Sequence, residues 1–358
     1  MLNYLPVNTD KKYLFAEADK KSFDRFLQDK LADKCSMFIL MDANTKKFCK
    51  SKLIHNFPLL QSAQEVIIKS GETHKNLEAC NLIWKKLIEA HADRHSLLLN
   101  LGGGVITDIG GFAASVYKRG ITFCNIPTTL LAMTDAAAGG KTGINFQSLK
   151  NVVGSFRTAE ITYIDTTFLK TLPSGHMRSG FAELLKIALV ADKKFWKELV
   201  KMNFYELADN PKIIQKALAL KEGIVSQDPE EKGLRKLLNF GHTIGHSIES
   251  YSLLHEKESL LHGEAVAIGI LCEAYISYIT GMLPEKQLKE IAKTLLTIFG
   301  KYKGNLKEKE LLRFIRNDKK SVNSKHNFTL LKNIGEGCID NFVNKKMISA
   351  SLQYYVHL

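Results

Sequence analysis

Apolar and polar residues follow two different patterns along the chain. In the first half, short apolar runs stand at residues 36–42, 65–70, 96–102, 120–127 and 161–165. Each run has the length of a buried strand, whereas residues 76–90 and 106–118 have helical periodicity. Strands that alternate with helices are typical of a parallel sheet, so this half of the chain predicts an α/β domain.

The pattern changes after the stretch "TLPSG" at residues 171–175. Later segments have helical periodicity at residues 176–190, 211–226, 233–252, 262–281 and 285–299, and only residues 327–331 resemble a strand. A chain of 358 residues is too long for one ordinary core. We therefore predict an α/β domain at residues 1–173 and a mostly α-helical domain at residues 174–358.

The composition is ordinary for a globular protein, with 45% hydrophobic and 24% charged residues. The apolar runs are too short to cross a membrane, the first residues lack a signal-peptide pattern, and the six cysteines are scattered. These features predict a cytoplasmic protein with no membrane partner. The net charge is +13, but the lysines are spread along the chain and no nucleic-acid-binding motif occurs. A small anionic substrate explains this charge more simply than nucleic acid.

A glycine-rich turn follows the predicted strand at residues 96–102. The stretch "LLLNLGGGVITDIGGF" predicts a strand, a turn of three glycines and the start of a helix. Backbone N–H groups in such a turn can approach an anion, which the helix N-terminus also attracts. Asp108 follows this turn, and Asp42 and Asn44 end an earlier strand, where carboxylates and amides bind the sugars of nucleotides. Helix capping is the alternative role for each of these side chains.

A second candidate for anion binding is the stretch "IPTTLLAMTDAAAGGKTGIN" at residues 126–145. Its "GGKT" resembles part of a P-loop, but Asp135 stands where that motif requires its first glycine, so we exclude a nucleoside triphosphatase. The stretch still favours close approach of backbone to an anion with a lysine as counter-charge, and a tight buried loop is the alternative. The polar residues concerned are Thr128, Thr129, Asp135, Lys141, Thr142, Lys150 and Asn151.

The segment "LLNFGHTIGHSIES" at residues 237–250 has the composition of a metal site. Arg235, Asn239, His242, His246 and Glu249 are separated by steps of four, three, four and three, which places them on one face of a predicted helix. Imidazoles at positions i and i+4 can bind one metal ion. A glycine precedes each histidine, although glycine destabilises a helix by about 1 kcal/mol relative to alanine. We expect neighbouring backbone or substrate to approach closely there.

The predicted metal site has more candidate ligands than a zinc ion needs. Spacing alone does not choose among Glu183, His242, His246, His262 and Glu264. Cationic residues in the same half would suit a substrate with carboxylate and phosphate groups, because guanidinium and ammonium groups bind both. These residues are Lys186, Lys221 and Arg235.

Several long motifs occur together in one order: "GGGVITDIGGFAASVYKRGI", "PTTLLAMTDAAAGGKTGIN", "GFAELLK", "DPEEKGLRKLLNFGHTIGHSIE" and "HGEAVAIG". Over about residues 36–335 the chain resembles the 3-dehydroquinate synthases, a family of sugar phosphate cyclases. The resemblance implies an NAD-binding α/β domain, a helical metal-binding domain and a homodimer. It also implies that Glu183, His242 and His262 bind zinc or cobalt, whereas His246 lies in the active site without binding the metal.

The resemblance implies roles for further residues. NAD contacts are implied for Asp42, Asn44, Glu72, Lys75, Gly103, Gly104, Asp108, Thr128, Thr129, Asp135, Lys141, Lys150, Phe168 and Thr171. Contacts near the substrate phosphate are implied for Arg119, Lys150, Asn151 and either Lys319 or Lys320. Catalytic roles, including recognition of the substrate carboxylate and hydroxyls, are implied for Asp135, Lys141, Lys186, Lys221, Glu231, Arg235, Asn239 and His246.

The implied substrate is 3-deoxy-D-arabino-heptulosonate 7-phosphate, an anionic sugar phosphate that the family converts into 3-dehydroquinate and phosphate. In the family, NAD oxidises one ring alcohol, phosphate leaves by elimination, the hydride returns, and the ring opens and closes through an aldol step. No net redox change results. The alternatives are a sister cyclase such as an amino-dehydroquinate synthase, and a metal-dependent polyol dehydrogenase, which would accumulate NADH.

Overall fold

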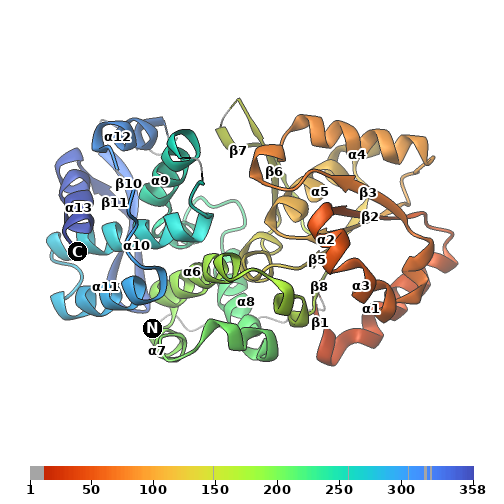
Figure 1. Ribbon diagram of the computed structural model, residues 1–358, viewed down its shortest axis with the longest axis horizontal. Coiled ribbons are helices and arrows are strands. Elements are labelled where there is room, and N and C mark those ends of the chain that lie inside the picture. The colour runs from red at the N-terminus through yellow and green to blue at the C-terminus, as the bar shows by residue number, and fades with distance from the viewer. Residues whose placement is uncertain (1–11, 148, 257, 305, 318–320, 323–324) are drawn as a thin grey trace. The chain divides into compact units, whose positions relative to one another are not determined.

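The computed structural model describes residues 12–147, 149–256, 258–304, 306–317, 321–322 and 325–358 (Figure 1). The chain divides into two compact units. The first unit comprises Met1–Pro173 and Tyr205–Leu218, and the second comprises Ser174–Phe204 and Ala219–Leu358. A short segment from the C-terminal half of the sequence therefore packs with the first unit.

The first unit is built on a parallel sheet of six strands in the order β1-β8-β5-β4-β2-β3. The strands are β1 (Tyr13–Phe15), β2 (Met37–Asp42), β3 (Gln64–Ile68), β4 (Leu97–Gly102), β5 (Thr122–Pro127) and β8 (Ile161–Ile164). All of their pairings are parallel. The central strands are buried almost throughout because helices cover both faces, and the predicted α/β domain is confirmed.

The strand order reverses between β2 and β4. From β2 the chain passes outward to β3, returns to β4 on the other side of β2, and continues to β5 and β8. In open parallel sheets, ligands bind at the carboxyl ends of the strands beside such a reversal. Asp42 ends β2 and Gly103 follows β4, so two of the predicted cofactor residues stand at this position.

Two helices, α4 (Leu77–Glu89) and α5 (Gly104–Val116), share a hydrophobic core with one face of the sheet (Figure 1). α5 contacts both the sheet and α4, and its interior residues are buried. Gly110 permits this position, since a Cβ there would lie 2.0 Å from the side-chain oxygen of Asn100 on β4. The start of α5, which follows the predicted glycine turn, is thereby held close to the sheet.

The other face of the sheet is covered by α1 (Ala16–Ala32) and α3 (Lys50–Asn56), the latter preceded by the short helix α2 (Ala43–Phe48). Phe23 of α1, Phe57 after α3 and Tyr163 of β8 pack ring against ring, with centroids 4.5–5.2 Å apart. Helix α1 was not predicted from the sequence. Its only fully buried side chains are Phe23 and Leu27, so its apolar pattern is weak.

The stretch at residues 126–145, for which a tight buried loop was the alternative to an anion site, contains regular structure. After β5, Ala132–Ala136 forms a π-helical turn, and an antiparallel hairpin of β6 (Lys141–Phe146) and β7 (Leu149–Phe156) follows. The hairpin carries Lys141, Lys150 and Asn151, three of the predicted binding residues.

The second unit is mostly helical, as predicted. Its helices are α6 (Ser174–Ala191), α7 (Lys193–Leu199), α9 (His242–His255), α10 (His262–Ile279), α11 (Glu285–Phe299), α12 (Glu308–Asn317) and α13 (Lys345–His357), and α8 (Pro211–Val225) ends in this unit. Helix α10 is central, because it contacts α6, α9, α11 and α13 and is buried along most of its length. Within the described ranges, every helix lacks either the length or the apolar character of a membrane span.

A small antiparallel sheet completes the second unit. Its order is β11-β10-β9, formed by β9 (Ser321–Val322), β10 (Lys325–Asn333) and β11 (Glu336–Val343). The strand predicted at residues 327–331 lies inside β10. Strand β11 was not predicted, because its residues are only partly buried and alternate weakly.

Candidate metal and cofactor sites

The histidine segment is not one continuous helix, which corrects the sequence-based prediction. Leu234–Asn239 forms a 3-10 helix, η7, and α9 begins only at His242. Between them Gly241 has a φ of 78°, a left-handed conformation that interrupts the helical path. Arg235 and Asn239 therefore do not lie on the helix of the two histidines, and the predicted single face of five polar residues is wrong.

Glycines allow α9 to lie directly against α10. A Cβ on Gly241 would lie 2.5 Å from Cγ1 of Ile270, and a Cβ on Gly245 would lie 3.1 Å from the carbonyl oxygen of Ala265. On the opposite helix, a Cβ on Gly269 would lie 1.9 Å from the carbonyl oxygen of Gly241. The glycines beside the histidines thus admit neighbouring backbone, one of the two occupants expected from the sequence.

Glu183 of α6, His242 of α9 and His262 of α10 bring potential metal-binding atoms together. Oε1 of Glu183 lies 3.6 Å from Nε2 of His242 and 3.4 Å from Nε2 of His262. Ligand atoms around a tetrahedral zinc ion are about 3.3–3.6 Å apart, given bonds of about 2.0–2.2 Å. The spacing of the carboxylate oxygen from both imidazole nitrogens therefore fits zinc.

The second ring nitrogen of each of these histidines has a hydrogen-bond partner. Nδ1 of His242 lies 3.2 Å from the carbonyl oxygen of Phe240, and Nδ1 of His262 lies 3.2 Å from Oε2 of Glu249. When Nδ1 donates, Nε2 keeps a lone pair that a metal ion can accept. Glu249, which the sequence placed near the histidines without a distinct role, thus orients the ring of His262.

The charge of Glu183 is maintained in a buried position. Its side chain is 3% exposed and forms an ion pair with Lys186, one turn further along α6. Burial acts to raise the pKa of Glu183, but Lys186, His242 and His262 together hold this pKa well below 4.5. None of the described residues gives either carboxylate oxygen a hydrogen bond of normal geometry. A buried ionised carboxylate of this kind is suited to bind a cation.

His246 lies beside this group. Its ring centroid is 5.0 Å from that of His242 and 5.7 Å from that of His262. One ring nitrogen from each of the three histidines falls within 4.8 Å of the others, so a set of three imidazoles is a second possible ligand set. Glu264, the fifth candidate, instead accepts a hydrogen bond of 2.9 Å from the backbone of Leu261 and caps α10.

A loop held by Asp228 leads into η7. The Asp228 carboxylate accepts hydrogen bonds of 2.7–3.0 Å from the backbone N–H groups of Lys232, Gly233 and Arg235. The Arg235 side chain is 3% exposed, and its guanidinium donates to the carbonyl oxygen of Pro229 at 2.6 Å. The loop that precedes η7 therefore holds the guanidinium in part.

Other residues expected to bind substrate belong to the same unit. The Asn239 amide donates to the Glu231 carboxylate at 2.5 Å. Lys221 of α8 is 4% exposed and Lys186 of α6 is 2% exposed. Buried ammonium groups of this kind favour anionic ligands, so the unit combines a candidate metal centre with cationic residues.

In the first unit, Lys75 connects several predicted cofactor residues. Its side chain is 3% exposed, and its ammonium group contacts Asp108 of α5 and, at 2.6 Å, Oδ1 of Asn151 on β7. Burial raises the pKa of Asp108, although Lys75 acts to lower it. Asn145 extends this network, because it donates to Glu72 and accepts from the backbone of Asn151, both at 2.9 Å. Asn145 was not predicted, since its role depends on partners distant in sequence.

Some predicted cofactor residues have structural roles as well. Asp42 accepts a hydrogen bond of 2.8 Å from the backbone of Thr45 and caps α2, the alternative that the sequence left open. Gly103 is the N-cap of α5, and a Cβ there would lie 3.0 Å from Cγ2 of Thr129. Glycine at this position therefore makes room for the Thr129 side chain, and the N-terminal end of the α5 dipole favours an anion.

The remaining predicted residues of this unit occupy its loops, helix starts and hairpin. They are Asn44 and Gly104 in the first turns of α2 and α5, Arg119 in the turn after α5, Thr128 after β5, Asp135 in the π-helical turn, Lys141 and Lys150 on the hairpin, and Phe168 and Thr171 in the 3-10 helix Thr166–Thr171. Arg119 is exposed and has a φ of 67°. Lys319 and Lys320 lie outside the described residues.

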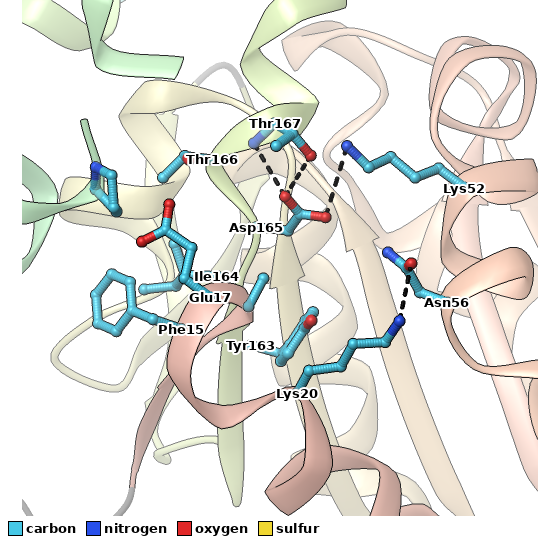
Figure 2. A pocket seen from close by; sticks show the side chains of 12 residues that line it. Phe15, Glu17, Lys20, Lys52, Asn56, Tyr163, Ile164, Asp165, Thr166 and Thr167 are labelled. Atoms are coloured by element: carbon cyan, nitrogen blue, oxygen red, sulfur yellow. Dashed lines mark hydrogen bonds and ion pairs between the residues drawn. The ribbon is translucent and has the colours of Figure 1, made fainter. Parts of the chain in front are cut away.

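A pocket of about 300 Å³ lies at the carboxyl ends of β1 and β8 (Figure 2). Asp165 forms part of its wall, where Oδ1 accepts the backbone N–H of Thr167 at 3.0 Å and Oδ2 lies 3.7 Å from the ammonium of Lys52. None of the predicted site residues is among the described residues that line it. Lys52 nevertheless connects the pocket to Phe168, a predicted NAD contact, because its ammonium lies 5.3 Å from that ring centroid.

Comparison with known proteins covers both units. Residues 65–179 match the family model described as 3-dehydroquinate synthase N-terminal, and residues 180–321 match the one described as 3-dehydroquinate synthase C-terminal. A 3-dehydroquinate synthase of Parabacteroides distasonis is 40% identical over 353 residues, which cover 97% of this chain and 98% of that protein.

Solved structures with the same fold include two sugar cyclases. A 2-epi-5-epi-valiolone synthase from Streptomyces hygroscopicus subsp. jinggangensis, with NAD+ and Zn2+ bound, has a TM-score of 0.79 and 27% identity, with 97% of each chain covered. A 2-deoxy-scyllo-inosose synthase complexed with carbaglucose-6-phosphate, NAD+ and Co2+ has a TM-score of 0.82 and 24% identity over 96% of each chain. At that identity, the second likeness concerns the fold alone.

Proposed function

The chain belongs to the 3-dehydroquinate synthase family, and we propose how its residues convert 3-deoxy-D-arabino-heptulosonate 7-phosphate into 3-dehydroquinate and phosphate. We propose that the first unit binds NAD and that the second binds a zinc or cobalt ion. The structural relative that holds NAD+ and Zn2+ supports both assignments. When bound, NAD+ takes a hydride from a ring alcohol and returns it, and the metal ion stabilises negative charge on oxygen.

The observation that carries this proposal is the convergence of three ligand atoms in the second unit. We assign the metal to Glu183, His242 and His262, because Oε1 of Glu183 lies 3.4–3.6 Å from both Nε2 atoms. We assign His246 a role beside the metal, as the family resemblance implies; its ring centroid lies 5.0 Å from that of His242, and its imidazole can transfer a proton. Three protein ligands leave a coordination position for substrate.

Charged residues of the second unit bind the rest of the substrate in this proposal. Arg235 presents a planar guanidinium to the substrate carboxylate, and Lys221 adds a second positive charge. Lys186 keeps Glu183 ionised through their ion pair. Asn239, held by Glu231, donates to a substrate hydroxyl. Desolvated cations of this kind discriminate strongly against substrates without a carboxylate.

The first unit holds the cofactor by the ends of its strands. Gly103 and Gly104 leave the N-terminus of α5 open to the pyrophosphate of NAD. Asp42, which ends β2, and the paired side chains of Lys75 and Asp108 bind the sugars. We assign the substrate phosphate to Arg119, Lys150 and Asn151. The family resemblance implies the same role for Lys319 or Lys320, which lie outside the described residues.

The test is release of phosphate from the heptulosonate phosphate by purified enzyme with trace NAD+ and Zn2+. We expect stoichiometric phosphate without accumulation of NADH, loss of activity after chelation, and recovery when Zn2+ is added back. Net NADH formation without phosphate release would identify a polyol dehydrogenase instead. A higher kcat/KM for the amino analogue of the substrate would identify an amino-dehydroquinate synthase.

We also propose a cytoplasmic homodimer. The hairpin exposes apolar side chains, of which Phe146, Leu149 and Phe156 are 45%, 53% and 62% exposed, and a second chain would cover such a surface. All six cysteines are free, which fits a reducing compartment. Light scattering after size-exclusion chromatography should give twice the monomer mass of 40.2 kDa.

A further inference from the structure

Glu273 is an acidic residue in the interior of the second unit. It lies in the middle of α10, and its side chain is 0% exposed. Acidic side chains are almost never fully buried unless they are paired or hydrogen-bonded, because an isolated carboxylate loses several kcal/mol of hydration in the interior. Its partners therefore indicate why a carboxylate stands there.

Both carboxylate oxygens of Glu273 bind the start of α9. Oε2 accepts the backbone N–H of Gly241 at 2.6 Å, and Oε1 accepts the backbone N–H of Ile244 at 3.1 Å. The first N–H groups of a helix have no partner within the helix, and a side chain at the N-cap commonly satisfies one of them. Gly241 occupies the N-cap and has no side chain, so Glu273 replaces the missing cap from another helix.

Close packing restricts α9 at the same point. Gly269 lies one turn before Glu273 on α10, and a Cβ at Gly269 would lie 1.9 Å from the carbonyl oxygen of Gly241. The negative charge of Glu273 also interacts favourably with the positive end of the α9 dipole. Steric contact and two charge-assisted hydrogen bonds therefore fix where α9 begins.

His242 is the first residue of α9 and lies between the two backbone groups that Glu273 binds. The direction of its ring depends on that helix start, since Nδ1 reaches the carbonyl oxygen of Phe240, the residue before Gly241. We propose that Glu273 is a positioning residue, which sets the start of α9 and so aims Nε2 of His242 at the ligand atoms of Glu183 and His262. This inference rests on the metal site of the proposed function.

The test compares Glu273→Gln and Glu273→Asp with Ser277→Ala. Glutamine can accept only one of the two N–H groups and presents an NH2 group to the other, and aspartate is too short to reach both. Ser277 is also buried on α10, one turn further on, where its hydroxyl donates to the carbonyl oxygen of Glu273 and accepts the N–H of Leu331. Its loss should lower stability without moving α9.

Zn2+ affinity is measured by competition with a chromogenic chelator, and the thermal midpoint is measured on the metal-free proteins. We expect Zn2+ affinity to fall at least about 10-fold in both Glu273 variants, the range seen when outer partners of metal ligands are lost. We expect Ser277→Ala to bind Zn2+ within about 2-fold of the parent while it melts earlier. The visible absorption of the Co2+-loaded Glu273 variants should also change, because the geometry around the ion is altered.

The inference would be overturned if both Glu273 variants bound Zn2+ within 2-fold of the parent and their Co2+ spectra were unchanged. A loss of affinity in Ser277→Ala equal to theirs would also overturn it, since the effect would then follow stability alone. If one Glu273 variant does not fold, the other decides. If the parent protein itself binds no Zn2+ under these conditions, the proposed metal site fails, and that result is distinct from failure of the positioning role.

Discussion

Nδ1 of His262 lies 3.2 Å from Oε2 of Glu249, a carboxylate on the neighbouring helix α9 that is 6% exposed. Carboxylates in this position fix the tautomer of a metal-binding imidazole and increase its basicity. We predict that Glu249→Ala weakens Zn2+ binding by about 10–100-fold, measured by chelator competition. Glu249→Gln should lose less, because its amide oxygen can still accept the Nδ1 proton.

Glu256, the C-cap residue of α9, is a control for Glu249. Glu256 accepts a hydrogen bond from Ser252 but contacts none of the three proposed ligands. Glu256→Gln should therefore leave Zn2+ affinity unchanged. Equal affinities of the Glu249→Ala protein and the parent would mean that Glu249 does not orient a metal ligand.

One substitution tests the proposed metal site, and a second distinguishes the two possible ligand sets. If Glu183, His242 and His262 bind the metal, His262→Ala should lose the metal and the activity while the fold is retained. His246→Ala should retain the metal but lose activity, because only a proton-transfer group is removed. Metal content by plasma emission spectroscopy and circular dichroism are the measurements. Loss of metal from His246→Ala would favour the three-histidine set, and a metal-replete, active His262→Ala protein would contradict both sets.

The helices and strands that the sequence predicts well are those whose pattern of apolar residues lies within one continuous segment of the chain. Strand β4 is an apolar run, interrupted by Asn100, because it is buried on both faces. Helices α6 and α10 were likewise predicted, because their helical periodicity continues over many residues. By contrast, α1 buries only Phe23 and Leu27, which is too few for a clear helical period.

The features that could not be predicted depend on contacts between distant segments. Gly241 interrupts the histidine segment, because it takes a left-handed conformation where α10 presses against it at Ile270. The spacing of the polar residues in the sequence continues across Gly241, so periodicity does not reveal this break in the helix. Likewise Asn145 acts through Glu72, 73 residues earlier in the chain, and no local pattern indicates that contact.

We predict that Gly269→Ala strongly destabilises the second unit. Its new methyl group would lie 1.9 Å from the carbonyl oxygen of Gly241, and relief of such overpacking typically costs about 1–3 kcal/mol or more. Gly175→Ala in α6 is the matched control, because its methyl group would meet only the end of the flexible Leu261 side chain at 3.3 Å. Urea unfolding should give a lower midpoint for Gly269→Ala only. A similar midpoint for both would show that α9 and α10 can separate without cost.

Acid should weaken the contact between β11 and η7. Hydrogen bonds from Asn327 and Lys236 lower the pKa of Asp340 below its ordinary value of 3.8. A carboxyl group with a depressed folded-state pKa stabilises the protein above its unfolded-state pKa, and this contribution is lost as the pH falls through the folded-state value. Unfolding free energy should therefore fall less steeply below about pH 4 in Asp340→Asn than in the parent. The effect should be small because Asp340 is half exposed. Parallel pH profiles would exclude it.

The last prediction concerns how Arg235 recognises the substrate. The guanidinium is buried and fixed by the carbonyl oxygen of Pro229, and the Asp228 carboxylate holds the backbone of the same loop. A hydrogen bond to a charged group contributes about 1.5–3 kcal/mol, so Arg235→Ala should lower kcat/KM by about 10–150-fold or more. Arg235→Lys should recover only part of this loss, since an ammonium cannot bind a carboxylate in bidentate fashion.

Lys232→Ala is the matched control for Arg235, because Lys232 belongs to the same loop but its side chain pairs with Glu230 at the surface. Its kcat/KM should equal that of the parent. A substrate analogue that lacks the carboxylate completes the test. If Arg235 binds that carboxylate, the parent should lose much of its kcat/KM on the analogue, whereas Arg235→Ala should lose little more, because the interaction is already absent. Equal additional losses in both proteins would show that Arg235 acts elsewhere in the reaction, and the specificity for a carboxylated substrate would then have to come from another cation such as Lys221.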